Sequence, residues 1–188
     1  MFRFTLLNHL CHDMEQVHDT SRPPDRIRQD VTRSPGGDSS LFLNNCVGCH
    51  NGMDPLAQAF AYYDFDETTQ RLVYDSNEVN SKYFNNDATF ADGFVTPDDS
   101  WHNHWRQGQN ANLGWNGALP GQGNGAKSLG QELAGTQAFA ECQVKKVFKA
   151  VCLRDPDRNQ VTALTNTFRG AFDLKQVFAD SAGYCMGN

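Results

Sequence analysis

The feature that most constrains this chain of 188 residues is the pentapeptide CVGCH at residues 46–50. In a helix, Cys46 and Cys49 lie one turn apart, so both thiols face the same side. Each thiol can then form a thioether with one vinyl group of a haem. His50 is rotated about 100° further round the helix, so its imidazole can reach the iron. The pattern therefore predicts one covalent haem c, attached through Cys46 and Cys49, with His50 as the proximal iron ligand.

Three other uses of a C-x-x-C pair compete with this interpretation. A structural zinc site commonly has two such pairs or a later pair of histidines, and the chain has no second cysteine pair at ligand spacing. A redox-active pair usually follows a strand in a βαβ unit, and no such pattern surrounds Cys46. A structural disulfide between Cys46 and Cys49 stays open and would make His50 incidental.

Composition and charge narrow the class of protein. Hydrophobic residues make up 39% of the chain and aromatic residues 11%, which is enough to bury a core and excludes wholesale disorder. The 16 Lys and Arg against 22 Asp and Glu give a net charge of -6, so we expect no nucleic-acid partner. No apolar run approaches the length that crosses a bilayer, so we expect no membrane span.

A longer stretch around the motif carries a family resemblance. FLNNCVGCHNGMDPLAQAFAYYDFD, residues 42–66, continues from the pentapeptide into Met-Asp-Pro-Leu and then an aromatic and acidic run. It resembles the monohaem planctomycete-type cytochrome c proteins, and residues 128–156 are similar to the C-terminal helical module of that family. The resemblance implies a mainly α protein: a cytochrome c-like haem domain with long ordered loops and a C-terminal helical module. Because the family proteins are typically larger and exported, it also implies a periplasmic or otherwise extracytoplasmic location and upstream domains of the same polypeptide.

Helix patterns and breaks predict two regions. At the N-terminus, apolar residues at three- and four-residue spacing predict an amphipathic helix that ends before the Pro-Pro pair. These apolar residues are Phe2, Leu6, Leu7, Leu10, Met14 and Val17. The Pro-Gly-Gly run at residues 35–37 predicts a break, after which Ser39 or Ser40 caps a helix that carries the motif. We expect a haem-binding region over residues 1–122 and a helical module packed against it over residues 123–188.

Capping residues and turn composition predict further boundaries. Asp54 followed by Pro55 predicts a new helix with Asp54 as its N-cap. Residues 64–119 predict long loops with one short hairpin, in which AYYDF and RLVY pair across DETTQ. The last third predicts four helices, each beginning at a capping residue. These residues are Ser128, Thr136, Asp155 and Asp173.

The four cysteines outside the motif predict disulfides. Cys142 and Cys152 share one expected helix, whose rise separates them by about 15 Å, whereas a disulfide needs Cα atoms within about 7 Å. Two schemes stay open: Cys11–Cys142 with Cys152–Cys185, or Cys11–Cys152 with Cys142–Cys185. Four reduced thiols are less expected, because covalent haem is attached in an oxidising compartment.

The sixth iron ligand stays open. A methionine opposite the histidine would raise the reduction potential, a second histidine would lower it, and an empty site would allow small ligands to bind. Met53 begins on the proximal side and cannot easily reach over the haem. The histidines of SWHNHW lie in an expected loop, where surface or pocket lining is favoured over ligation. The candidate ligands are Met14, Met186, His102 and His104.

These observations predict an electron carrier more than an enzyme, because no nucleophile–base constellation stands out. The expected function is single-electron transfer by an extracytoplasmic monohaem c-type cytochrome with a redox partner protein that the sequence does not identify. One alternative is a haem enzyme, or the electron-delivery segment of a larger oxidoreductase, with an open distal site. Another is a structural or binding module.

Overall fold

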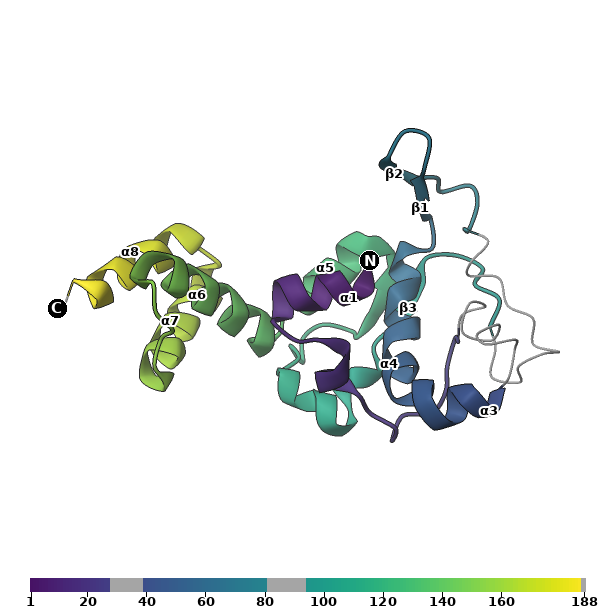
Figure 1. Ribbon diagram of the computed structural model, residues 1–188, viewed down its shortest axis with the longest axis horizontal. Helices are drawn as coiled ribbons and strands as arrows, with labels where there is room; N and C mark the ends of the chain where they lie inside the picture. The colour runs from purple at the N-terminus through teal and green to yellow at the C-terminus, as the bar shows by residue number, and fades with distance from the viewer. Residues whose placement is uncertain (28–38, 81–93, 187–188) are drawn as a thin grey trace.

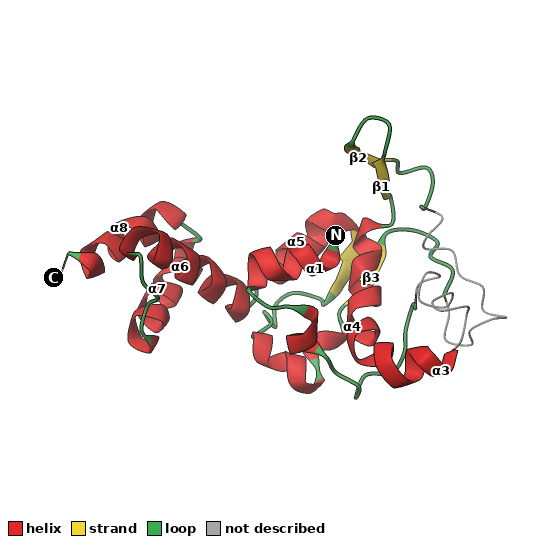
Figure 2. Cartoon of the chain, viewed as in Figure 1, coloured by secondary structure: helices red, strands yellow, loops and turns green. Residues whose placement is uncertain are grey.

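The computed structural model in Figure 1 describes residues 1–27, 39–80 and 94–186. Within these residues the chain is predominantly helical, with four short strands (Figure 2). The helical elements, with η for 3-10 and π turns, are α1 (Phe2–Thr5), η1 (Leu6–Leu10), η2 (Met14–Val17), α3 (Ser39–Leu41), η3 (Phe42–Cys46), α4 (Val47–Ala57), η4 (Gln58–Phe60), η6 (His104–Arg106), η7 (Gly108–Leu113), α5 (Gly125–Ala134), α6 (Gln137–Cys152), α7 (Arg158–Ala171) and α8 (Leu174–Cys185). The strands are β1 (Tyr63–Asp66), β2 (Arg71–Tyr74), β3 (Ser100–His102) and β4 (Gln122–Asn124). No helix of the described part is both long and apolar enough to cross a membrane.

A cluster of buried apolar side chains, which we call the first core, joins the N-terminal helical segments to α4, β3 and α5. Its members are Phe2, Leu6, Leu10, Val17, Leu56, Ala57, Ala59, Trp101, Trp105, Leu113, Leu129, Leu133 and Ala138. Leu6 and Leu10 are almost completely buried, and each such leucine contributes about 2 kcal/mol through the hydrophobic effect. Of the apolar positions predicted for the N-terminal segment, Phe2, Leu6, Leu10 and Val17 are buried, whereas Leu7 and Met14 are only partly buried.

The C-terminal helices form a second core that extends away from the first (Figure 1). Its members are Ala140, Val144, Val147, Phe148, Leu164, Phe168 and Val177. The long helix α6 packs against both α7 and α8, and it begins in the first core at Ala138. Helix α6 therefore contributes its first turn to the first core and the rest of its length to the second, while α5 belongs to the first core.

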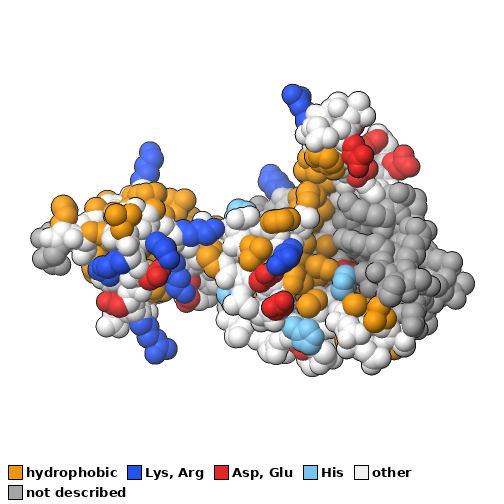
Figure 3. All heavy atoms as spheres, in the orientation of Figure 1, with side chains coloured by type: hydrophobic (Ala, Val, Ile, Leu, Met, Phe, Trp, Pro, Cys, Tyr) orange, Lys and Arg blue, Asp and Glu red, His pale blue; other side chains and the backbone are white. Residues whose placement is uncertain are grey.

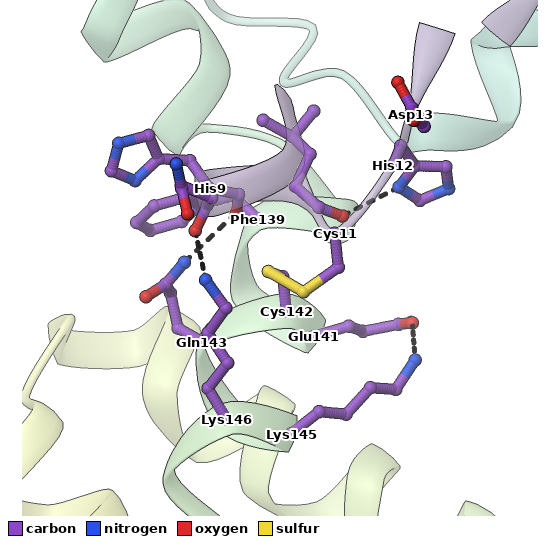
Figure 4. Close-up of a disulfide and its surroundings, with 12 residues drawn as sticks. His9, Cys11, His12, Asp13, Phe139, Glu141, Cys142, Gln143, Lys145 and Lys146 are labelled. Carbon is purple, nitrogen blue, oxygen red and sulfur yellow. Dashed lines mark hydrogen bonds and ion pairs between the residues drawn. A yellow bond between two sulfur atoms is a disulfide. The ribbon is translucent and has the colours of Figure 1, made fainter. Parts of the chain in front are cut away.

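Two disulfides pair the four cysteines outside the motif. Cys11 is bonded to Cys142 and Cys152 to Cys185, each with Cα atoms 5.4 Å apart. This is the first of the two schemes that the sequence left open. Figure 4 shows the first bond, which ties the end of η1 to α6.

Hydrogen bonds reinforce this junction between the N-terminal segment and α6. The Gln143 amide donates to the carbonyl of His9 at 3.1 Å, and the Lys146 ammonium donates to the carbonyl of Asn8 (Figure 4). These carbonyls belong to the last turn of a helix, where intrahelical partners run out. The side chains of α6 therefore complete the end of η1.

The described residues form two pairs of antiparallel strands, and only one of these pairs was predicted from the sequence. The expected hairpin is confirmed: β1 and β2 are antiparallel, with Phe65 opposite Leu72, and they project from the body of the molecule (Figure 1). The antiparallel pair β3–β4, which places Trp101 opposite Gly123, was not predicted from the sequence. SWHNHW was therefore wrongly expected to be a loop, because its pairing partner is distant in sequence.

The helix boundaries differ from the predictions at several points. The N-terminal helix stops at Leu10, because Cys11 is left-handed with a φ of 57°, and Asp13 caps the separate turn η2. The predicted cap Ser128 is wrong, since α5 begins at Gly125 and the Ser128 hydroxyl instead accepts from the Trp101 indole at 2.7 Å.

The other predicted N-caps belong to the C-terminal helices α6, α7 and α8. Thr136 and Asp173 are confirmed as the caps of α6 and α8. Asp155 is wrong, because Asp157 forms a capping box with Gln160 and sets the start of α7. The break expected at residues 35–37 lies outside the described residues, as does the side chain of Ser39.

Candidate functional site

The CVGCH motif lies at the junction of η3 and α4, where the chain continues as one helical run. Cys46 immediately precedes α4, and Cys49 and His50 lie in its first turn. The predicted helical placement of the motif is confirmed. Cys46 and Cys49 are therefore separated by about one helical turn, the spacing that the sequence analysis required.

Two glycines explain how α4 packs against the rest of the molecule. A Cβ atom at Gly48 would overlap the imidazole of His18, and one at Gly52 would overlap the indole of Trp105. Residues four apart share a helix face, so this glycine face lets two rings approach the backbone closely. Cys49 and His50 are rotated about 100° and 200° from Gly48, and they consequently lie away from the packed face.

The two thiols of the motif are unpaired and half-buried. Cys46 packs beside the buried side chains of Ile27 and Phe42. The Cys49 thiol lies 3.7 Å from the carbonyl oxygen of Met14, and its burial raises its pKa, with the neighbouring Cys46 adding to the effect. The Cys46–Cys49 disulfide left open by the sequence is not formed in this structure.

His50 is held by two neighbours. Its Nδ1 atom lies 2.9 Å from Oδ1 of Asp54, whose side chain is completely buried. Its ring meets that of Phe42 edge-on, with centroids 6.2 Å apart. Among the described residues, Nε2 of His50, the ring nitrogen that does not face Asp54, makes no hydrogen bond.

The place of Asp54 corrects a sequence prediction. Asp54 was expected to cap a new helix beginning at Pro55, but α4 runs through both residues to Ala57. Pro55 lies in the last turn, where its missing N–H removes one hydrogen bond and the helix soon tightens into η4. The i, i+4 spacing of His50 and Asp54 was the signal that sequence reasoning missed.

The donor set of this region fits a covalently attached haem. It provides two unpaired thiols that lie one helical turn apart, and the imidazole of His50 beside them. Among the described residues, only Nδ1 of that imidazole makes a hydrogen bond, so Nε2 could bind the iron. Over the same part of the chain, no group of three or more His, Cys, Asp or Glu is arranged to hold a metal ion directly.

The candidate sixth ligands fall in different places. Met186 follows α8 at the far end of the molecule from α4 (Figure 1) and is exposed. Met14 lies beside the motif, since its carbonyl contacts Cys49. Met53 packs against the first core from α4 itself. Of the methionine candidates, the structure therefore brings Met14 to the motif and leaves Met186 remote.

His102 and His104 form a pair at β3 and η6, both of which contact α4. Their rings lie 4.6 Å apart, and Nε2 of His104 lies 2.5 Å from a carboxylate oxygen of Asp25. Burial lowers the pKa of His102, and the neighbouring His104 lowers it further. His104 would have to release Asp25 before that nitrogen could bind iron.

A buried ion pair was missed by sequence reasoning. Glu132 is 2% exposed and accepts from Nε and Nη2 of Arg106, each at 2.8 Å, and from the Asn103 amide at 2.8 Å. Asn103 also caps η6, the turn that carries His104 and Trp105. This network fixes the segment that packs against the glycine face of α4. Nothing local in the sequence indicates it, because Arg106 and Glu132 belong to different elements.

Figure 3 shows histidine side chains at the surface of the larger body of the molecule, which carries α4.

Comparisons with family models, with curated proteins and with solved structures found no match to this chain. The resemblance of residues 42–66 to planctomycete-type cytochromes therefore stays a prediction.

Proposed function

We propose that this chain is an extracytoplasmic monohaem c-type cytochrome that transfers single electrons. One observation carries the proposal. Of six cysteines, four form two disulfides, and the two that do not are the pair one helical turn apart beside His50. A chain in which disulfides form readily, yet in which this close pair is left as thiols, is suited to using those thiols for another covalent bond.

The roles of the residues follow from their positions on α4. Cys46 and Cys49 would each form one thioether, and His50 would be the proximal ligand through Nε2. The haem supplies an iron that cycles between the ferrous and ferric states. The glycine face of α4, packed on His18 and Trp105, holds the helix in place so that the attachment residues stay on its other side.

The location and the partner belong to the same proposal. Disulfides persist in oxidising compartments, and the pairs Cys11–Cys142 and Cys152–Cys185 support a periplasmic or otherwise extracytoplasmic site. The partner would be another redox protein that accepts or donates one electron. The same proposal takes the first core as the cytochrome c-like haem domain, and it takes α6 to α8 as a helical module packed against that domain.

A pyridine haemochrome spectrum tests the attachment. The full chain would be exported behind a signal peptide in a host with c-type maturation, and so would the double variant Cys46→Ala/Cys49→Ala. We expect a c-type spectrum that survives acid-acetone extraction for the native chain and its loss in the variant. The matched control is Cys152→Ala/Cys185→Ala, which removes two cysteines far from α4 and should retain covalent haem. Folded native chain without covalent haem would overturn the proposal.

The spin state of the ferric protein separates the carrier from the alternative enzyme. A low-spin, six-coordinate spectrum is the result expected for an electron carrier, and Met14→Ala and His102→Ala would then show which residue supplies the sixth ligand. A high-spin spectrum would favour an open distal site and small-ligand chemistry.

A further inference from the structure

Helix α4 buries the carboxylate of Asp54 one helical turn after His50, and the proposed function does not yet explain this burial. Asp54 is 0% exposed, and its Oδ1 atom is 2.9 Å from Nδ1 of His50. Burying a carboxylate is costly unless it makes strong hydrogen bonds. The helix itself sets this contact, because residues four apart are neighbours on one face.

The chemistry of the contact specifies which form of His50 is present. An ionised carboxylate can only accept hydrogen bonds, so Nδ1 of the neutral imidazole must carry the proton. Nε2 is then left with its lone pair and is the atom able to bind a metal. Phe42 limits rotation of the ring by its edge-on contact, so both the tautomer and the orientation are fixed.

A carboxylate partner also changes the strength of the ligand. A hydrogen bond from a metal-bound histidine to a carboxylate orients the ring and raises its basicity as a ligand. A negative charge close to the site further favours the more positive ferric state of an iron centre. Both effects act in the same direction and lower the reduction potential.

We propose that Asp54 is a positioning residue that holds His50 as the Nδ1–H tautomer, presents Nε2 to the iron and lowers the reduction potential of the haem. The inference rests on the proposed function for its redox part, whereas its tautomer part concerns only this chain's own residues. It gives Asp54 a task that capping a helix would not, since the carboxylate points at His50 from inside α4.

Potentiometric titration of the haem-loaded full chain tests the redox part. Asp54→Asn keeps the size of the side chain and an oxygen that can accept from Nδ1, but it removes the charge. We expect a higher reduction potential in this variant and a further rise in Asp54→Ala. The matched control is Asp155→Asn, which removes one exposed carboxylate from the C-terminal helices, and its potential should equal that of the native chain. A potential that Asp54→Asn leaves unchanged, or lowers, would overturn this part.

Nitrogen NMR of the full chain, produced without c-type maturation and therefore free of haem, tests the tautomer part. Long-range couplings from the ring protons of His50 should report a protonated Nδ1 in the native chain. In Asp54→Ala the pattern should shift toward a protonated Nε2, the form that an unconstrained histidine prefers. A protonated Nε2 in the haem-free native chain refutes the inference, whether or not haem is attached when the chain is matured. Absence of covalent haem, by contrast, refutes the proposed function and leaves the tautomer result to be judged by itself.

Discussion

The two cores of this molecule bury different kinds of side chain. The second core is almost entirely apolar, and its buried polar groups are the small hydroxyls of Thr165 and Ser181. Around the first core, carboxylates and amides are buried as well. These are Asp19, Asn51, Asp54, Gln58, Asn103, Asn110 and Glu132.

The second core therefore depends on apolar packing alone, whereas the first core also contains buried polar groups that hold neighbouring elements in place. An apolar core folds without directional partners, whereas a buried amide or carboxylate is costly unless hydrogen bonds compensate for its lost hydration. Asn103 and Glu132 hold η6, and Asp54 holds His50. The first core therefore accepts polar groups that are costly to bury, and these groups position the elements around the motif.

Removing the disulfides should give the largest losses of stability in the molecule. Cys11–Cys142 closes a separation of 131 residues and links the two cores, while Cys152–Cys185 closes 33 residues inside the second. The chain-entropy model gives a loss of about 5 kcal/mol for the first bond and about 4 kcal/mol for the second. Denaturant unfolding of the paired Cys→Ser variants measures both. An equal or reversed order would show that strain or residual structure outweighs loop length.

The buried ion pair should be worth far more than an exposed one. Arg106→Ala leaves the Glu132 carboxylate buried without its cation, and we expect a loss of about 4 kcal/mol. Lys149→Ala is the matched control in the C-terminal helices, because Lys149 and Asp155 are 66% and 76% exposed. Such a surface pair contributes about 0.5 kcal/mol. Similar losses in the two variants would mean that Glu132 is hydrated in solution and that the first core is less closed than it appears in the structure.

The same contrast explains which features could be predicted from the sequence. Thr136 and Asp173 were recognised as caps because a cap acts on the backbone two or three residues away. The β1–β2 hairpin was recognised for the same reason, since its turn lies between its strands. The CVGCH motif was likewise a local pattern, and its helical placement was predicted from the nearby cap candidates Ser39 and Ser40.

The missed features depend on segments distant in sequence or on competing uses of one residue. Trp101 pairs across a sheet with Gly123, and Arg106 meets Glu132 from another element. Asp54 before Pro55 satisfies the local rule for a helix start, but the bond to His50 and the continuing helix outweigh it. Local rules therefore described the second core better than the first.

Two glycines test how closely each region is packed. Gly52→Ala places a methyl group against the Trp105 indole, which is buried and cannot easily move, and we expect a loss of about 3 kcal/mol. Gly183→Ala is the control, since no atom lies within 4 Å of the added Cβ on α8. There, replacing a helical glycine should add about 0.5 to 1 kcal/mol of stability. Thermal unfolding measures both, and a neutral Gly52→Ala would show that α4 does not rest on Trp105 in solution.

The smallest effect concerns the edge of the first core, where Arg3 meets Asp13. The Arg3 guanidinium donates to both carboxylate oxygens at 2.7 and 2.6 Å, and this lowers the pKa of Asp13 from its ordinary value of 3.8 to about 2, with the Met14 amide adding to the effect. Because the folded pKa lies below the unfolded one, the pair stabilises the folded chain above about pH 4. That stabilisation is lost as the pH falls from about 4 towards 2.

Arg3→Ala should therefore raise the pKa of Asp13 towards 3.8, as measured by NMR titration of its carboxyl carbon. Stability at neutral pH should change little, because an exposed ion pair is screened by water and salt. Arg3→Lys is the control, since it keeps the charge but not the two parallel hydrogen bonds. In this variant the pKa of Asp13 should lie between its values in the native chain and in Arg3→Ala. An unchanged pKa in Arg3→Ala would assign the shift to the Met14 amide and make the capping box, not the ion pair, the feature that fixes η2 at the edge of the first core.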